Sequence, residues 1–285
     1  MKLITFEHAG VVKAGFLDGD EAVICDDGPQ AADAVLARIV AGTKGDWAAK
    51  DRVPLADIRL LAPIPNPLRD VICIGKNYHA HAAEFFASGF DSSKKEAVPS
   101  SPVVFTKAMT AICGPDDHVL GSLDPTGTVD YEGELGIVIG TKAQRVSKDA
   151  AMDYIAGYVI INDVTSRELQ KKHNQWTIGK GLDTFCPIGP WIVTADEVAD
   201  VTALKLTTFV NGELRQNAKL QDLIFDIPTL IETITATGTL LPGDIIATGT
   251  PAGVGIGFTP PKYLVNGDVV TVKISGLGEL TNTIT

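Results

Sequence analysis

Short apolar runs separated by turn-forming residues dominate the first part of the chain and predict strands. Residues 2–6 and 22–25 are apolar and rich in strand-forming side chains, and residues 17–20 have the composition of a turn between them. The apolar positions of residues 31–40 instead fit a short helix. The beginning of the chain is therefore expected to mix strands with one helix.

A proline-rich segment follows this first group of elements. Three prolines lie within residues 62–67, and proline is not tolerated inside a helix. We therefore expect an extended linker there. The pattern predicts a small N-terminal α/β domain over residues 1–62 and a larger domain over residues 63–285.

The larger part is rich in predicted strands. The strand candidates are residues 71–74, 103–105, 135–139, 157–162, 204–210, 244–248 and 269–274. Helices are expected over residues 164–173 and 225–236, and Asn211-Gly212 indicates a hairpin turn. Because strands do not alternate regularly with helices of about 10–15 residues, the pattern predicts a strand-rich α+β fold rather than a doubly wound one.

Composition narrows the classes of partner. Among 285 residues, 35 Asp and Glu outnumber 24 Lys and Arg, for a net charge of −11, which disfavours nucleic acid and anionic membranes as partners. The sequence contains no uninterrupted apolar run of about 20 residues, and its first ten residues do not resemble a signal peptide. The four cysteines form no CxxC pair, and Cys186 is expected to be structural. A soluble protein of a reducing compartment, the cytoplasm, is the expectation.

Three acids form the strongest chemical signal. Glu132 and Glu134 are two residues apart in an apolar segment, so their side chains would share one face of a buried strand. Like charges there require a shared proton, cationic partners or a metal. Asp163 ends another apolar run, and three acids without nearby His or Cys favour Mg²⁺ or Mn²⁺. Solvated acids at a strand edge are the alternative.

A possible acid–base pair lies earlier in the chain. His81 and Glu84 are three residues apart in a segment that resembles a short helix, so they would be neighbours on one helical face. A carboxylate beside an imidazole can orient it as a general base that activates water. A histidine–glutamate contact on the surface would show the same spacing.

Lys180, Arg167 and Gln170 are candidate substrate contacts. Glycines flank Lys180, which could let the backbone approach a ligand, so this lysine could pair with a carboxylate or enolate. On a helix, positions 163, 167 and 170 would share a face and present an anion clamp and an amide donor beside the metal. An exposed loop lysine and an ordinary surface helix are the alternatives.

A glycine-rich segment covers residues 249–257. It lacks the GxxxxGK[ST] pattern, and Pro260 and Pro261 follow where a dinucleotide-binding loop would continue into a helix. The sequence instead predicts a loop whose backbone amides, with the hydroxyl of Thr250, hold a small carboxylate.

These segments, in this order, resemble the fumarylacetoacetate hydrolase superfamily. The resemblance extends from about residue 62 to residue 285. Its pieces are the segments at residues 74–78 with His81 and Glu84, 130–135, 161–167, 179–190, and 242–255. It implies a mixed β-roll core preceded by a small N-terminal domain, and a homodimer.

The resemblance also implies roles for individual residues. It places Mg²⁺ or Mn²⁺ on Glu132, Glu134 and Asp163, and Lys180 beside the 2-oxo acid end of the substrate. It places Thr250 on the substrate carboxylate, and His81 with Glu84 on a lid that orders with substrate. Arg167 and Gln170 match positions near the ligand. The segment from residue 88 to 101 is longer than in many relatives and is expected to be a mobile loop that influences substrate choice.

The implied activity is hydrolysis of a C–C bond in a 2-oxo or 2,4-dioxo acid, such as an acylpyruvate or a 2,4-diketo-3-deoxy acid. Oxaloacetate decarboxylation and isomerisation of a hydroxymuconate-like dienol are alternatives, because both pass through the same enolate. A metabolite-binding protein without turnover is the alternative outside catalysis, since a fold does not fix a function.

Overall fold

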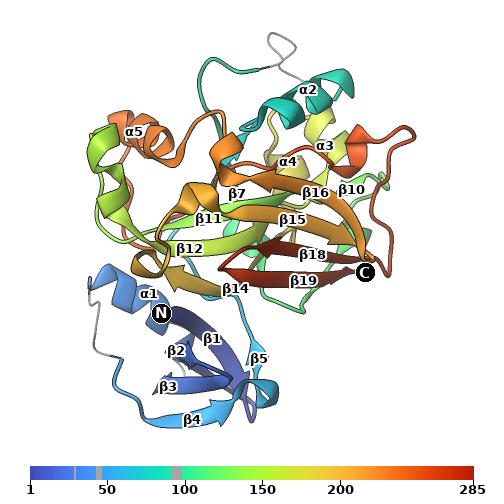
Figure 1. Cartoon of the computed structure of the whole chain (residues 1–285). Coiled ribbons are helices and arrows are strands. Elements are labelled where there is room, and N and C mark those ends of the chain that lie inside the picture. Colours follow the sequence, from blue (N-terminus) through green and yellow to red (C-terminus); the bar gives the residue numbers. More distant parts are fainter. Residues whose placement is uncertain (29, 43–46, 91–97) are drawn as a thin grey trace.

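The computed structural model of the chain describes residues 1–28, 30–42, 47–90 and 98–285 (Figure 1). Its strands form one large sheet, a five-stranded sheet and a two-stranded sheet. The two larger sheets enclose most of the apolar core. The expected long loop at residues 88–101 lies partly outside the described residues, and its influence on substrate choice stays a prediction.

The N-terminal strands form one end of the large sheet. They are β1 (Lys2–His8), β2 (Val11–Asp18), β3 (Glu21–Asp27), β4 (Asp51–Pro54) and β5 (Arg59–Leu60). Their order is β4-β3-β2-β1, and β5 also pairs with β1. The strands expected at residues 2–6 and 22–25 are confirmed, whereas β2 was not anticipated. The predicted helix begins as a 3-10 turn and continues as α1 (Ala34–Val40).

The large sheet continues from these strands into the rest of the chain. β1 pairs antiparallel with β14 (Cys186–Thr194), with Lys2 opposite Val193. The remaining strands of this sheet are β12 (Ile155–Asn162), β11 (Gly133–Ile139), β17 (Ile245–Ala247), β6 (Val71–Gly75), β7 (Val103–Lys107) and β8 (Ile112–Cys113). Since the N-terminal strands share a sheet with the others, the domain boundary near residue 62 stays a prediction. Most neighbours are antiparallel but β17 and β6 are parallel, so the sheet is mixed.

The second sheet packs against the central strands. Its order is β16 (Glu213–Lys219), β15 (Lys205–Val210), β18 (Val269–Ile274), β19 (Gly278–Ile284) and β9 (His118–Val119). The predicted hairpin turn is confirmed, because Asn211 and Gly212 connect β15 to β16 with φ angles of 51° and 79°. Positive φ at both positions is characteristic of a type I′ turn, which asparagine followed by glycine favours. The two-stranded sheet pairs β10 (Val129–Asp130) with β13 (Thr165–Ser166).

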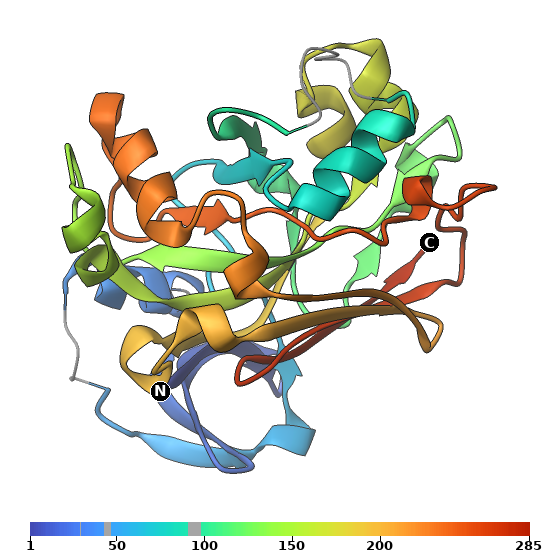
Figure 2. The ribbon, with the colours of Figure 1, turned by 45° about the horizontal axis from the view of Figure 1, so that its top comes forward.

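Three short helices lie together beside one edge of the strands, and a fourth lies apart from them (Figures 1 and 2). The group contains α2 (His79–Ala87), α3 (Arg167–Lys172) and α4 (Thr177–Lys180), and the separate helix is α5 (Ile227–Thr237). Asp226 caps α5 by accepting a hydrogen bond from the Thr229 amide, and Pro228 lies in its first turn as expected.

One predicted helix is shorter than the sequence indicated. Residues 164–173 were expected to be helical, but Thr165 and Ser166 pair with β10 as strand β13. The helix therefore begins only at Arg167. The expectation that Asp163, Arg167 and Gln170 share one helical face is wrong, because Asp163 lies before β13.

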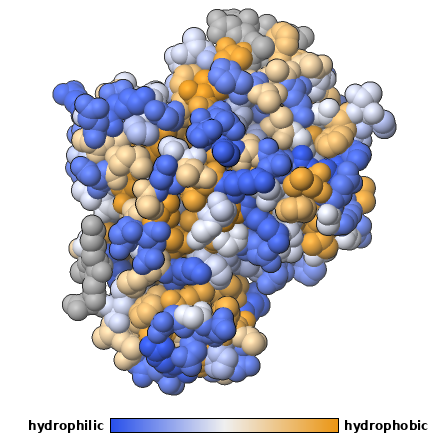
Figure 3. Space-filling view, in the orientation of Figure 1, coloured by the Kyte–Doolittle hydropathy of each residue, from blue (hydrophilic) through white to orange (hydrophobic). Residues whose placement is uncertain are grey.

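The described helices are all short. None of them is long and apolar enough to cross a membrane. Hydrophilic and hydrophobic residues are interspersed over the face shown in Figure 3, as is usual for folded proteins.

Candidate functional site

Strand pairing brings the three predicted acids together. Glu134 belongs to β11, Glu132 immediately precedes that strand, and Asp163 immediately follows β12. The antiparallel register places Gly133 opposite Asn162, and the Asp163 amide donates to the Glu132 carbonyl at 2.8 Å. One carboxylate oxygen from each acid lies within 4.8 Å of the others. The three residues are only 0–5% exposed, so the alternative of solvated acids at a strand edge is excluded.

Three buried cations contact this group of acids. Lys180 Nζ bridges Glu132 Oε2 at 2.8 Å and Asp163 Oδ2 at 2.7 Å. Arg167 Nη1 lies 2.6 Å from Glu132 Oε1, while its Nε donates to Asp130 Oδ2 at 2.9 Å. Lys107 Nζ lies 2.7 Å from Asp163 Oδ1. The alternative of an exposed Lys180 is thus excluded, since this residue is 2% exposed.

The cations near this cluster do not contact all of its acids equally. Among the described residues, the ion pairs of Lys180, Arg167 and Lys107 end on Glu132, Asp163 and Asp130, and not on Glu134. Burial alone would raise the pKa of Glu132, but Lys180, Arg167 and a smaller contribution from His81 lower it to about 2. The pKa of Glu134 is raised well above its usual value by burial and by the charges of Asp163 and Glu132. Without a metal, Glu134 is therefore the member of the cluster that most favours its protonated, neutral form.

The position of Glu134 bears on whether the residues fit a metal. The ion pairs end on Glu132, Asp163 and Asp130, whereas Glu134 Oε2 accepts a hydrogen bond from the Gly249 amide at 2.7 Å. A divalent cation would remove the electrostatic disadvantage of Glu134, and three converging carboxylates are the oxygen ligands that Mg²⁺ and Mn²⁺ prefer. The site fits such an ion, which would compete with the Lys180 ammonium for Glu132 and Asp163.

The predicted histidine–glutamate pair lies on α2 and faces the acids. His81 Nδ1 is 3.3 Å from Glu84 Oε2, as the spacing of three residues on a helix predicts. His81 is 4% exposed and lines the same cavity as Glu132 and Glu134, so this is not a surface contact. Glu84 also accepts a hydrogen bond from the Gly253 amide at 3.1 Å, which joins α2 to the glycine-rich segment.

The glycine-rich segment binds carboxylates of the chain itself. Amides of Gly249 and Gly253 donate to Glu134 and Glu84, and those of Gly255 and Ile256 donate to Asp130. The expectation that these amides hold a substrate carboxylate therefore differs from what the structure shows. Thr250 lines the cavity, but its hydroxyl donates to the Gly133 carbonyl at 2.9 Å, so a substrate contact would compete with this bond.

The structure bears on two expectations about the neighbouring helices. Gly179 was expected to let the backbone approach a ligand, but a Cβ there would lie 2.4 Å from the Gln170 amide nitrogen. Gly179 therefore allows α4 to pack closely against α3. Arg167 and Gln170 do line the cavity, and Arg167 already binds Asp130 and Glu132 through Nε and Nη1, so a contact with a ligand anion stays a prediction. Arg167 Nη2 is buried without a hydrogen-bond partner among the described residues.

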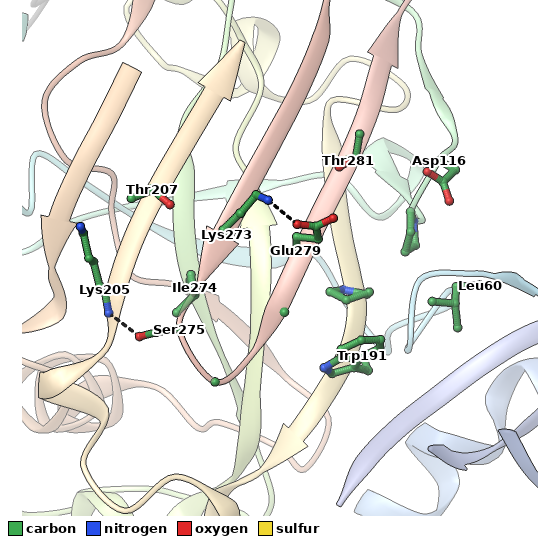
Figure 4. Close-up of a pocket in the computed structure, with 14 residues that line it drawn as sticks. Leu60, Asp116, Trp191, Lys205, Thr207, Lys273, Ile274, Ser275, Glu279 and Thr281 are labelled. Carbon is green, nitrogen blue, oxygen red and sulfur yellow. Dashed lines mark hydrogen bonds and ion pairs between the residues drawn. The ribbon is translucent and has the colours of Figure 1, made fainter. Parts of the chain in front are cut away.

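The cavity between these side chains is small. Its free volume of about 10 Å³ has room for about one water molecule. The residues that line it are Ile74, Gly75, Lys76, His81, Phe85, Phe105, Glu132, Glu134, Arg167, Gln170, Trp176, Lys180 and Thr250. A larger hollow of about 770 Å³ lies beside β15, β18 and Trp191, but the predicted site residues are not among those that line it (Figure 4).

Sequence reasoning missed several members of this site. Lys76 and Lys107 are buried although lysine is normally exposed, and the only available signal was their position at the ends of apolar strands. The rings of Phe85 and Phe105 each pack edge-to-face against Trp176, with centroids 6.1 Å and 5.2 Å away. No spacing in the sequence indicates that these three rings meet. By contrast, Cys186 is structural as expected, since burial raises the pKa of its thiol to about 12.

Comparisons with known proteins agree with this architecture. Residues 70–285 match the family described as fumarylacetoacetate (FAA) hydrolase C-terminal, and residues 1–63 match the family described as Rv2993c-like, N-terminal. Oxaloacetate tautomerase YisK from Bacillus subtilis is 48% identical over 81% of this chain and 74% of its own length.

Solved structures extend the likeness to the fold. A fumarylacetoacetate hydrolase from Exiguobacterium antarcticum is 40% identical, with a TM-score of 0.86 over 100% of this chain and 99% of that one. A maleylpyruvate hydrolase from a Sphingobium species, in complex with manganese and pyruvate, is 33% identical, with a TM-score of 0.80 over the same shares. The strand-rich α+β fold expected from the resemblance is confirmed. The family match over residues 70–285 and these relatives show that the chain belongs to the fumarylacetoacetate hydrolase family.

Proposed function

We propose that this protein is a divalent-cation-dependent enzyme that interconverts the keto and enol forms of a 2-oxo acid, with oxaloacetate as the first candidate substrate. The observation that carries the proposal is the convergence of three carboxylates, Lys180 and His81 around one buried cavity. The 48% identical relative from Bacillus subtilis, an oxaloacetate tautomerase, supports this choice among enolate reactions.

The cation and Lys180 supply positive charge at one end of the cavity. Mg²⁺ or Mn²⁺, held by Glu132, Glu134 and Asp163, would draw electron density from the 2-oxo group when it is bound. Lys180 contributes a second, permanent charge. Burial alone would lower the pKa of Lys180, but Asp163 and Glu132 outweigh burial and raise it, so the ammonium form is retained. A negative charge that develops on the C2 oxygen is stabilised by this ammonium group.

His81 moves the proton. Glu84 accepts a hydrogen bond from Nδ1, which leaves Nε2 as the basic atom. Nε2 takes a proton from C3, the C–H electron pair forms the C2=C3 bond, and the carbonyl electrons move to the C2 oxygen. Return of the proton to that oxygen gives the enol, and the reverse sequence gives the keto acid. No other reactant is consumed.

Substrate entry requires the cavity to open. His81 and Phe85 belong to α2 and form part of the wall of a space that holds about one water molecule. Movement of α2 away from the glycine-rich segment would admit the acid, and its return would exclude bulk water. Exclusion of water strengthens the interactions of Lys180 and the cation with the developing charge.

Hydrolysis of a C–C bond is the second candidate. It is favoured by the likeness to a maleylpyruvate hydrolase and uses the same enolate. His81 would deprotonate a water molecule that attacks the C4 carbonyl, and the electrons of the broken C3–C4 bond would pass to the C2 oxygen beside Lys180. Arg167, Gln170 and Thr250 would contact the rest of the substrate from the cavity wall. Decarboxylation of oxaloacetate, with departure of CO₂, needs no attacking water.

A panel of substrates separates these reactions. Purified protein with Mg²⁺ or Mn²⁺ is given oxaloacetate, acetylpyruvate and a 2,4-diketo-3-deoxy sugar acid, and enol loss, CO₂ release and cleavage products are measured. The proposal predicts keto–enol interconversion that His81→Ala lowers by about 10²–10⁴-fold. Rapid cleavage of acetylpyruvate without tautomerisation would favour the hydrolase, and tight binding without any product would favour a metabolite-binding protein.

A further inference from the structure

A buried lysine that the mechanism does not use lines the same cavity. Lys76 occupies the turn between β6 and α2 and is 4% exposed. Its φ angle is 56°, a left-handed conformation that residues other than glycine rarely adopt. Such strained residues often occur at functional sites, where the surrounding structure must hold them in place.

The turn that carries Lys76 is held firmly from both sides. The Asn77 side chain donates to the carbonyls of Thr248 and Phe225 at 2.8 Å and 3.0 Å and accepts from the Phe225 amide. On the other side, a Cβ at Gly75 would lie 2.4 Å from the Trp176 ring, so the backbone packs directly against that side chain. These contacts restrict the position of the Lys76 backbone.

Lys76 and Arg167 both line the cavity, and both lie near the Phe85 ring. Lys76 Nζ and the guanidinium carbon of Arg167 each lie 5.9 Å from the centre of the Phe85 ring. Arg167 uses Nε and Nη1 for Asp130 and Glu132, while Nη2 is buried with no hydrogen-bond acceptor among the described residues. A buried N–H group without an acceptor is uncommon in folded proteins, and a bound anion would satisfy it.

We propose that Lys76, together with Arg167 Nη2, binds the second carboxylate of a 2-oxo dicarboxylic acid. This inference rests on the proposed function, in which the 2-oxo acid end lies at Lys180 and the three acids. A carboxylate and an ammonium group attract strongly where water is excluded. The Phe85 and Phe105 rings line the same cavity and suit the short carbon chain between the two polar ends. Lys76 thereby selects substrates with a charged rather than an uncharged tail.

A matched pair of substrates tests this role. Oxaloacetate and 2-oxobutyrate have four carbons each, and a methyl group in 2-oxobutyrate replaces the second carboxylate. Exchange of the C3 protons with deuterated water, followed by NMR in the presence of Mg²⁺, measures enolisation of both. Each rate is divided by the exchange rate of the same acid without enzyme, because the second carboxylate of oxaloacetate itself favours the enol. On this scale the wild type is expected to prefer oxaloacetate by at least about tenfold in kcat/KM, as for hydrogen bonds to charged groups. Equal corrected rates on the two acids would overturn the inference.

Substitution of Lys76 gives the second test. Lys76→Met has the same Cβ, so its backbone strain is unchanged, and it should lower kcat/KM for oxaloacetate by about 10–100-fold, mainly through KM. Activity on 2-oxobutyrate should change less than about twofold, and Lys76→Arg should retain most of the preference. Lys205→Met, which removes an exposed lysine beside the hollow of Figure 4, is the control.

The outcomes distinguish the inference from the proposed function. Equal losses on both acids, or loss of the rise in melting temperature caused by Mg²⁺, would show that Lys76 is structural and would overturn the inference. If Lys76→Met does not fold, the inference is tested instead by the preference of the wild type for oxaloacetate and by the activity of Lys76→Arg on the two acids. If the wild type exchanges neither acid in the presence of Mg²⁺, the proposed function itself fails.

Discussion

Replacement of Glu134 by glutamine tests the charge balance of the buried cluster. The glutamine keeps an oxygen that can accept the Gly249 amide but removes the carboxylate whose pKa is raised by burial and by Asp163 and Glu132. In a chelator we expect the free energy of unfolding of Glu134→Gln to equal that of the wild type or exceed it by about 1 kcal/mol, because the ionised carboxylate is disfavoured in this buried site and the amide is neutral.

The same substitution should remove stabilisation by metal. A ligand present at 100 times its dissociation constant stabilises the folded state by about 2.7 kcal/mol. For a chain of this size that corresponds to a rise in melting temperature of about 5 °C. The wild type should show this rise with Mn²⁺ or Mg²⁺, and Glu134→Gln should show little or none. Differential scanning fluorimetry with and without metal measures both effects.

Glu132→Gln is the matched control, because it removes an acid that is paired. Lys180 and Arg167 hold the pKa of Glu132 at about 2 against the effect of burial. Loss of this carboxylate leaves buried cations without their partner and should cost about 3–5 kcal/mol in a chelator. If Glu134→Gln were destabilised as much as Glu132→Gln, the conclusion that the ionised form of Glu134 is disfavoured would be wrong. If it kept the full metal-induced rise, the metal site would be wrong.

The remaining predictions concern α2, acid stability and assembly. Gly257→Ala would place a Cβ 1.8 Å from Glu84 Oε1, so kcat should fall by about 100-fold while metal-induced stabilisation is retained; unchanged kcat would exclude a role for this contact. Burial raises the pKa of Asp124, but hydrogen bonds from Thr126, Thr128 and Ser166 outweigh it and lower the pKa. Urea unfolding of Asp124→Asn should therefore show a stability deficit that is full at pH 7 and disappears as the pH falls below about 3.9; a deficit independent of pH would refute this. Light scattering should give twice the chain mass of 30.1 kDa if the predicted homodimer forms, and 30.1 kDa would contradict it.

The sequence predicted the acid group because strand geometry determines it. Alternation places Glu132 and Glu134 on one face, and the next long apolar strand ends at Asp163. Antiparallel pairing of β11 with β12 is then sufficient to bring the three acids close together. His81 and Glu84 are three residues apart on one helix, so their contact depends only on local geometry and could be predicted as well.

The other parts of the site depend on contacts between residues far apart in the sequence, and these could not be predicted. Lys107 forms an ion pair with Asp163, which lies 56 positions later in the chain. The sequence distinguishes Lys107 only by its position at the end of an apolar strand. The start of α3 could not be predicted from its own composition, because pairing of Thr165 and Ser166 with β10 competes with helix formation. The amides of the glycine-rich segment were expected to hold the carboxylate of a small molecule, but in the structure they bind Glu84, Asp130 and Glu134 of the chain itself, which tertiary contacts bring to them.

Metal removal tests the central claim most directly. Enol absorbance of oxaloacetate is followed with the purified protein after exhaustive chelation, and again after Mg²⁺ or Mn²⁺ is restored. The account predicts that catalysed keto–enol interconversion disappears with the metal and returns with it. Full activity in the metal-free protein would contradict a cation held by Glu132, Glu134 and Asp163 as the source of catalysis.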